Sequence, residues 1–122
     1  MSSGLAAAMG LMLKAPMTSP LDRLFATITA RRDAGDAANS YTARLLSEGV
    51  AKCAKKFGEE AVEAALAAVS GNKDHLASES ADVLYHLAVL WAAAGITPEE
   101  VYAKLAAREG RSGLAEKASR KS

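Results

Sequence analysis

The sequence predicts an all-α fold: a four-helix bundle that is completed by dimerisation. Alanine, the residue with the highest helix propensity, supplies 28 of the 122 residues, whereas aromatic residues make up only 5%. Apolar residues recur three and four positions apart, which is the spacing of one helix face. Because alanine buries little apolar area, a single chain of this length has a thin core, and we expect a homodimer.

The first expected helix begins at Pro20 and ends near Arg32. Ser19 can cap its first turn, proline fits the first helical position, and Asp22 suits the positive end of the helix dipole. A loop over residues 33–39 follows.

The second expected helix covers residues 41–70, with Ser40 as its cap and Gly71 as its stop. No proline interrupts it. Gly49 and Gly58 each cost about 1 kcal/mol relative to alanine in a helix interior, so each marks either a kink or a close helix contact.

The third expected helix covers residues 73–94 and ends at Gly95. A fourth begins after Thr97, which forms a capping box with Glu100, and ends near Arg108. We expect residues 19–122 to form a single helical domain with a basic C-terminal tail from about residue 109. Residues 1–18 are expected to be a flexible N-terminal extension.

Composition and charge exclude several classes of protein. The formal net charge of +1 gives no support for a nucleic-acid-binding protein. The one cysteine, Cys53, excludes an intrachain disulfide framework and is expected to be packed. The apolar stretch over residues 5–13 is too short to cross a bilayer, and no basic segment precedes it as in a signal peptide. We therefore expect a cytoplasmic protein without a membrane or nucleic-acid partner.

Two acidic groups carry the candidate chemistry. Glu59, Glu60 and Glu63 occupy an arc of roughly 100° on the second expected helix, and Glu79 and Asp82 share one side of the third. If the two helices pack through neighbouring apolar stripes, four or five carboxylates meet at one edge, where like charges repel. Such a cluster fits a hard divalent cation, Mg²⁺ with Mn²⁺ as a possible substitute. The stripes consist of Val62, Leu66 and Val69 on one helix and Leu76, Val83, Leu87 and Leu90 on the other.

Lysines precede the acidic residues on the same helix face. Lys52, Lys55 and Lys56 fall in the arc of the glutamates if the second helix is continuous. A metal ion with ammonium groups nearby suits a polyphosphate substrate. The alternative is that Lys55–Glu59 and Lys56–Glu60 are ordinary ion pairs that stabilise a solvated helix by roughly 0.2–0.5 kcal/mol each.

The remaining polar and aromatic residues have plainer interpretations. His86 is interpreted as a packed residue that is hydrogen-bonded to Asp82 or to another helix, and His75 as a surface residue. Tyr85 and Trp91 are expected in the core or in dimer contacts.

Four separate segments resemble the phosphoribosyl-ATP pyrophosphatase family: residues 40–46 (SYTARLL), 56–63 (KFGEEAVE), 79–87 (ESADVLYHL) and 108–120 (REGRSGLAEKASR). The resemblance covers about residues 21–120 and places the chain among the all-α, MazG-like NTP pyrophosphatases. It implies hydrolysis of 1-(5-phosphoribosyl)-ATP to 1-(5-phosphoribosyl)-AMP and pyrophosphate, the second step of histidine biosynthesis. Magnesium is the implied cofactor, and an interlocked α-helical dimer is the implied assembly.

The pattern E-x-x-E followed by E-x-x-D in this family maps onto Glu60, Glu63, Glu79 and Asp82 as metal-binding residues. For the mechanism, we expect Glu59 or Glu60 to orient the attacking water or to take its proton. Arginine and lysine side chains are expected to bind the phosphates of the substrate. The residues expected in this role are Arg44, Lys52 and Lys56 for the triphosphate, and Arg108 and Arg111 for the ribose 5-phosphate.

Two features depart from the family pattern: residues 1–17 have no counterpart in its core, and Phe57 stands where a smaller aliphatic residue is expected. Two other functions are compatible with the helices and acids. A general (d)NTP pyrophosphatase of the same superfamily would share the acids but not residues 40–46 and 108–120. A non-catalytic helical dimerisation module would not bind Mg²⁺. Residue types leave open the number of metal ions, the general base and the phosphorus attacked.

Overall fold

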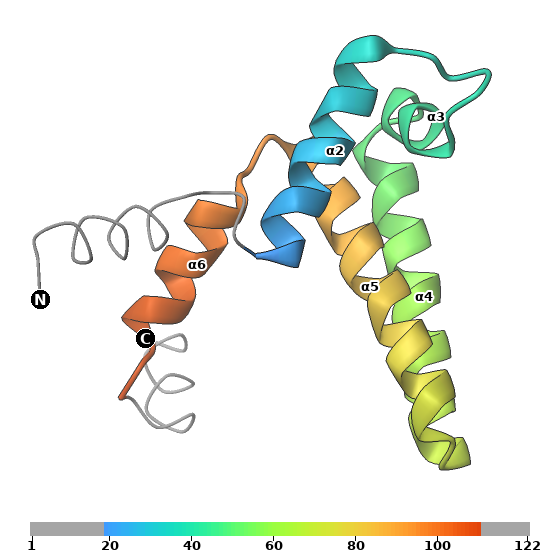
Figure 1. Ribbon diagram of the computed structural model, residues 1–122, viewed down its shortest axis with the longest axis vertical. Helices are drawn as coiled ribbons and strands as arrows, with labels where there is room; N and C mark the ends of the chain where they lie inside the picture. Colours follow the sequence, from blue (N-terminus) through green and yellow to red (C-terminus); the bar gives the residue numbers. More distant parts are fainter. Residues whose placement is uncertain (1–18, 111–122) are drawn as a thin grey trace, which may run out of the picture.

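The computed structural model describes residues 19–110. This part of the chain is all-helical, which confirms the predicted fold class (Figure 1). The expected N-terminal extension, the tail from residue 111 onward and Arg111 lie outside the described residues. The helices of the described residues are α2 (Pro20–Ala34), α3 (Tyr41–Ser47), α4 (Val50–Ser70), α5 (Lys73–Ala94) and α6 (Pro98–Ala107).

The helices begin close to the expected positions because the cap residues make the expected hydrogen bonds. The Asp22 backbone N–H donates to Ser19 Oγ, with a nitrogen-to-oxygen distance of 3.0 Å. Thr97 and Glu100 form a reciprocal capping box at the start of α6. At the start of α5 the cap is Asn72, whose side chain accepts from the N–H three residues on. Local hydrogen bonding therefore defines these helix ends.

The prediction of one continuous helix over residues 41–70 is wrong at Gly49. This glycine has φ 94°, a backbone conformation that other residues rarely adopt, and it separates α3 from α4. Gly58 lies inside α4, and no atom comes within 4 Å of the place where a Cβ would lie. Gly58 therefore marks neither a break nor a close contact. Residues 41–70 form two helices in place of the one expected.

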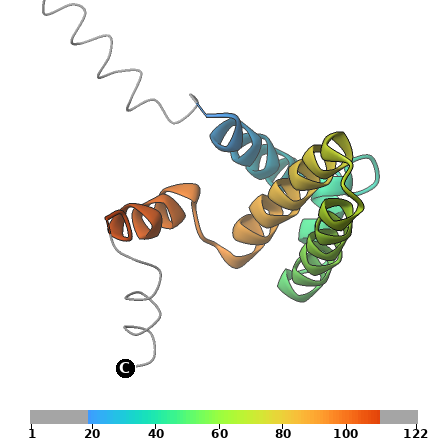
Figure 2. The same ribbon diagram turned by 90° about the horizontal axis from the view of Figure 1, so that it is seen from below.

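The longest structural unit is a hairpin of α4 and α5, with α2 and α3 packed at one end of it (Figure 1). The buried core lies at that end, where these four helices meet. Helix α6 stands apart from α4 in both views (Figures 1 and 2). The Tyr102 hydroxyl on α6 donates to Asp22 Oδ1 on α2 at 3.0 Å. The core consists of Ile28, Leu45, Cys53, Ala88, Val89, Trp91 and Ala92.

An apolar stripe on α4 lies on the surface of the chain. Val62, Leu66 and Val69 are 59%, 64% and 87% exposed, so the prediction that they pack against the next helix is wrong within one chain. Ala67, one position after Leu66, is the buried residue in this half of α4. Small side chains such as alanine let two helices approach closely, which favours packing through that side. We call Val62, Leu66 and Val69 the α4 stripe.

No single helix among residues 19–110 is long and apolar enough to cross a membrane. Helices α5 and α6 reach the required length and composition only when taken together, and they are bent by 107° relative to each other.

Truncating the centre of the core should destabilise the fold strongly. Ile28 is 1% exposed, and Ile28→Ala should lower the free energy of unfolding by about 2–5 kcal/mol because it leaves a cavity. Urea titration at one fixed protein concentration measures the change. The matched control is Thr27→Ala on the exposed side of the same helix, which should change stability by less than about 0.5 kcal/mol. Equal effects of the two substitutions would contradict the assignment of the core.

Candidate metal centre

Three carboxylates from two helices converge at the middle of the α4–α5 hairpin. Glu60 comes from α4, whereas Glu79 and Asp82 come from α5, where a spacing of three residues places them on one face. One oxygen of each carboxylate lies within 4.8 Å of the corresponding oxygens of the other two. The structure thus brings together three of the four residues that the sequence pattern assigns to metal binding.

The surroundings of these acids favour a bound cation. Within residues 19–110, the Oε2 atoms of Glu60 and Glu79 are buried and have no hydrogen-bond partner. The pKa of Glu60 is raised, first by its contact with the Glu63 carboxyl, then by burial and by the charges of Glu63, Asp82 and Glu79. Buried carboxylate oxygens without donors are costly alone, and oxygen is the donor that hard divalent cations prefer. The residues present therefore fit a divalent metal ion.

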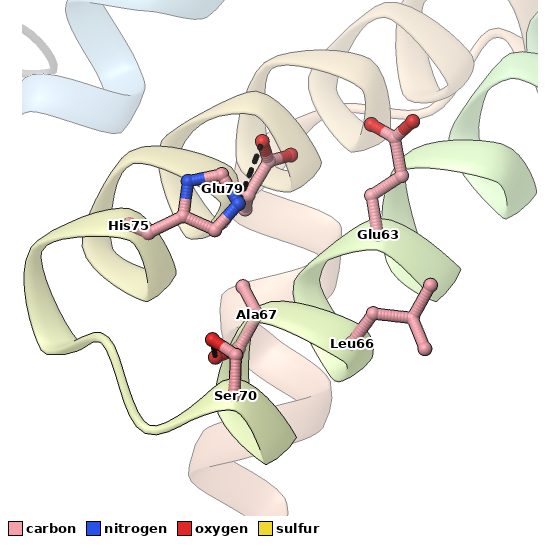
Figure 3. Close-up of a pocket in the computed structure, with 6 residues that line it drawn as sticks. All are labelled: Glu63, Leu66, Ala67, Ser70, His75 and Glu79. Atoms are coloured by element: carbon pink, nitrogen blue, oxygen red, sulfur yellow. Dashed lines mark hydrogen bonds and ion pairs between the residues drawn. The ribbon is translucent and has the colours of Figure 1, made fainter.

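Glu63, the fourth predicted metal-binding residue, lies beside this group rather than within it. A cavity of about 350 Å³ opens between α4 and α5, with Glu63 and Glu79 on its lining. Figure 3 shows Glu63 and Leu66 projecting from α4, and His75 and Glu79 from α5. The cavity adjoins the acidic group, because Glu79 belongs to both. A ligand in this space would therefore lie next to the carboxylates.

The predicted cationic residues are only partly gathered near the acids. Lys56 Nζ lies 3.3 Å from Glu59 Oε1, and this hydrogen bond is the main reason why the pKa of Lys56 is raised. The ion pair spans three residues, in place of the expected four-residue pair with Glu60. Lys52 and Arg44 are exposed to solvent. These three side chains therefore place positive charge at the surface of α3 and α4, where an anionic ligand could contact it.

Arg108 follows the last residue of α6 and is exposed. Because α6 stands apart from α4, the fold of one chain does not carry this end of the molecule to the acidic group (Figures 1 and 2).

His86 is a buried neighbour of the acidic group that sequence reasoning interpreted only as a packed residue. Its side chain is 7% exposed, and its Nε2 lies 3.7 Å from Glu60 Oε1. The structure thus selects a contact with another helix over the alternative bond to Asp82. Burial lowers the pKa of His86, and the charge of Lys56 lowers it further. The sequence signal for this proximity was the position of His86 one helical turn after Asp82.

Two other residues keep the interpretations made from sequence. His75 is a surface residue with a side chain 54% exposed, and its Nε2 lies 3.8 Å from Glu79 Oε1. Cys53 is packed at 1% exposure, and its thiol donates to the Leu45 carbonyl at 3.3 Å. Burial raises the pKa of that thiol, with Glu48 adding to the effect, so Cys53 is a core residue and not an activated nucleophile.

Comparison with known proteins identifies close relatives. The model of the phosphoribosyl-ATP pyrophosphohydrolase family matches residues 21–109. A phosphoribosyl-ATP pyrophosphatase of Azospirillum brasilense is 61% identical over 102 residues, which cover 84% of this chain and 91% of that protein. One of Parvibaculum lavamentivorans is also 61% identical over 102 residues and is covered over 93% of its length. One of Cereibacter sphaeroides is 60% identical over 100 residues and is covered over 96%. The family resemblance predicted from sequence is confirmed.

The raised pKa of Glu60 predicts a pH-dependent stability of the metal-free protein. A carboxyl whose pKa is raised by folding stabilises the fold at low pH, and this contribution is lost as the pH rises through its folded-state pKa. Glu60→Gln should therefore raise the free energy of unfolding at pH 7 in EDTA. The gain should shrink as the pH falls toward about 4.3, the usual pKa of glutamate. Urea titrations at several pH values measure it.

The control for this prediction is Asp33→Asn, which neutralises an exposed carboxylate on α2 and should change stability little at any of these pH values. A metal-free Glu60→Gln protein that is less stable than the parent at pH 7 would contradict the prediction.

Proposed function

The chain belongs to the phosphoribosyl-ATP pyrophosphohydrolase family, and we propose that its acidic cluster is the site of that chemistry. The reaction hydrolyses 1-(5-phosphoribosyl)-ATP to 1-(5-phosphoribosyl)-AMP and pyrophosphate in histidine biosynthesis. The observation that supports this site is the convergence of three carboxylates, two of which have a buried oxygen with no hydrogen-bond partner in the described part of the chain. A triphosphate is a polyanion and cannot approach such a group unless a cation lies between them.

Glu60, Glu79 and Asp82 would hold Mg²⁺, with Glu63 beside them at the edge of the cavity. When bound, the ion supplies a Lewis acid for phosphate oxygens and a coordinated water of lowered pKa. The carboxylates themselves fix the position of the ion relative to both helices.

The attacking water needs a carboxylate that orients it or takes its proton, and Glu59 and Glu60 are the proposed residues. Glu60 belongs to the metal-binding group, so its oxygens are committed there. Glu59 lies outside that group and is half-exposed, with Lys56 at 3.3 Å. Glu59 is therefore the more available of the two for proton transfer.

The cations on α3 and α4 are proposed to neutralise the triphosphate: Arg44 and Lys52, which are exposed, and Lys56, which is partly buried. Arg108 and Arg111 are proposed to bind the ribose 5-phosphate, because guanidinium groups can bond a terminal phosphate with two N–H donors. The separation of α6 from α4 within one chain favours delivery of these arginines across a dimer.

The α4 stripe supports a homodimer. Its three apolar side chains are more than half exposed and lie on consecutive turns of one helix. Such a face is usually covered by a partner, and a thin alanine-rich core makes the additional burial valuable. We propose that a second copy covers the stripe and that residues 19–122 act as one domain, with residues 1–18 as an extension. The protein is proposed to be cytoplasmic, with a nucleotide as its ligand and no membrane or nucleic-acid partner.

Removal of a metal-binding carboxylate should abolish turnover without unfolding the protein. Pyrophosphate release from 1-(5-phosphoribosyl)-ATP should require Mg²⁺. Glu63→Gln and Asp82→Asn should each reduce the rate by at least about 100-fold, because even outer-shell partners of metal ligands contribute 10–100-fold. Circular dichroism should remain that of the parent helices. Asp33→Asn, on α2 and away from the cluster, should retain full activity.

The same assay separates the proposed function from its rivals. Preferred hydrolysis of dCTP, dUTP or ATP would indicate a general nucleotide pyrophosphatase. Full activity of both Glu63→Gln and Asp82→Asn would refute the metal site.

A charge in the α4 stripe should weaken the dimer. Leu66→Asp places a carboxylate in the proposed apolar interface and should shift sedimentation equilibrium toward monomer by at least tenfold in the dissociation constant, equivalent to about 1.4 kcal/mol. Thr27→Asp adds the same charge to the exposed side of α2 and should leave association unchanged. A parent protein that sediments as a monomer at all concentrations would rule out the dimer.

A further inference from the structure

The Glu60 carboxylate has two oxygens in different surroundings. Its Oε1 lies 3.7 Å from Nε2 of the buried His86, whereas its Oε2 is buried without a hydrogen-bond partner among the residues that the structure describes. A carboxylate on a glutamate side chain can rotate about its last torsion angle, which is broad and poorly restrained by itself. At 3.7 Å, which is longer than a hydrogen bond, an N–H on this nitrogen would attract Oε1 electrostatically and favour the rotation in which that oxygen faces the imidazole.

The imidazole of His86 is itself held firmly. The Tyr85 ring meets it edge-on, with ring centroids 4.9 Å apart, and the Tyr41 ring does so at 6.3 Å. The Tyr85 hydroxyl shares a hydrogen bond with Thr42 Oγ1, which ties α5 to the start of α3. Ring contacts from α3 and α5 thus flank the His86 imidazole, whose Nε2 faces Glu60.

We propose that His86 is a positioning residue that orients the Glu60 carboxylate for metal binding. The inference rests on the proposed metal site and adds the residue that sets its geometry. His86 acts as the Nε2–H tautomer, because a lone pair on that nitrogen would repel the carboxylate oxygen that faces it. Nδ1 is the other ring nitrogen, and within residues 19–110 it has no hydrogen-bond partner.

His75 offers an instructive contrast on the same helix. Its Nε2 lies 3.8 Å from Glu79 Oε1, nearly the same distance, but its side chain is 54% exposed against 7% for His86. Water competes for an exposed contact and screens it, whereas a buried donor has no competitor. Distance alone does not distinguish the two histidines, and burial assigns the positioning role to His86.

The test is a pair of variants of the full chain with side chains of equal length. His86→Gln keeps an N–H donor near the position of Nε2, and His86→Met removes it with little change in volume. Mn²⁺ affinity, measured by electron paramagnetic resonance of the free ion, is the readout and needs no turnover. His86→Met should weaken Mn²⁺ binding at least tenfold, as expected for loss of an outer-shell partner, and His86→Gln should stay within about threefold of the parent.

The matched control is Val89→Ala, which truncates a fully buried residue of α5 in the core cluster. It should destabilise the protein and leave Mn²⁺ affinity unchanged, so general loosening of α5 is distinguished from loss of the donor. Equal Mn²⁺ affinities of His86→Gln and His86→Met would overturn the inference while the metal site stood. A parent protein that does not bind Mn²⁺ would overturn the metal site itself, and the inference with it.

A second measurement uses the unmodified protein and does not depend on the folding of any variant. Nitrogen-15 NMR of the histidine side chains reports which ring nitrogen carries the proton. The Nε2–H form of His86 is expected. The Nδ1–H form would place a lone pair against Glu60 Oε1 and would overturn the inference.

Discussion

The packing of α4 against α5 is the constraint on which the rest of the molecule depends. The two helices are joined by a short turn in which Gly71 has φ 81°, so their register is fixed close to the turn. This register places Glu60 of α4 opposite Glu79 and Asp82 of α5. It also seats Cys53 and Val89 in the shared core with α2 and α3.

A small-residue interface makes this close packing possible and leaves apolar surface elsewhere. Ala67, Ala88 and Ala92 are buried, and they contribute little area each. The larger side chains of the α4 stripe remain more than half exposed in one chain. The chain thus gains proximity between two acid-bearing helices while burying less apolar surface than a leucine-rich core would, which explains why a second copy is expected to complete the fold.

Much of the fold followed from local sequence signals. Ser19, Ser40 and the capping box of Thr97 define helix starts because each side chain bonds to an N–H three residues on. A kink at Gly49 was one of two expectations, but the full break between α3 and α4 was not predicted, since a glycine inside a helical pattern has the same local signature whether the helix bends, continues or ends. Helix α4 continues without a break through Gly58, nine residues later. Only the surrounding packing distinguishes the glycine that ends a helix from the one that does not.

The candidate site divides in the same way. Helical periodicity singled out five acids, Glu59, Glu60, Glu63, Glu79 and Asp82, and the family resemblance reduced them to four by leaving out Glu59. Sequence alone determined the helical class, the family and this set of acids. Tertiary structure decided which helix face is buried, that Glu63 stands beside the cluster, and that His86 lies against Glu60. Those outcomes depend on how the two helices are rotated about their axes relative to each other. The spacing of residues within one helix does not predict that rotation.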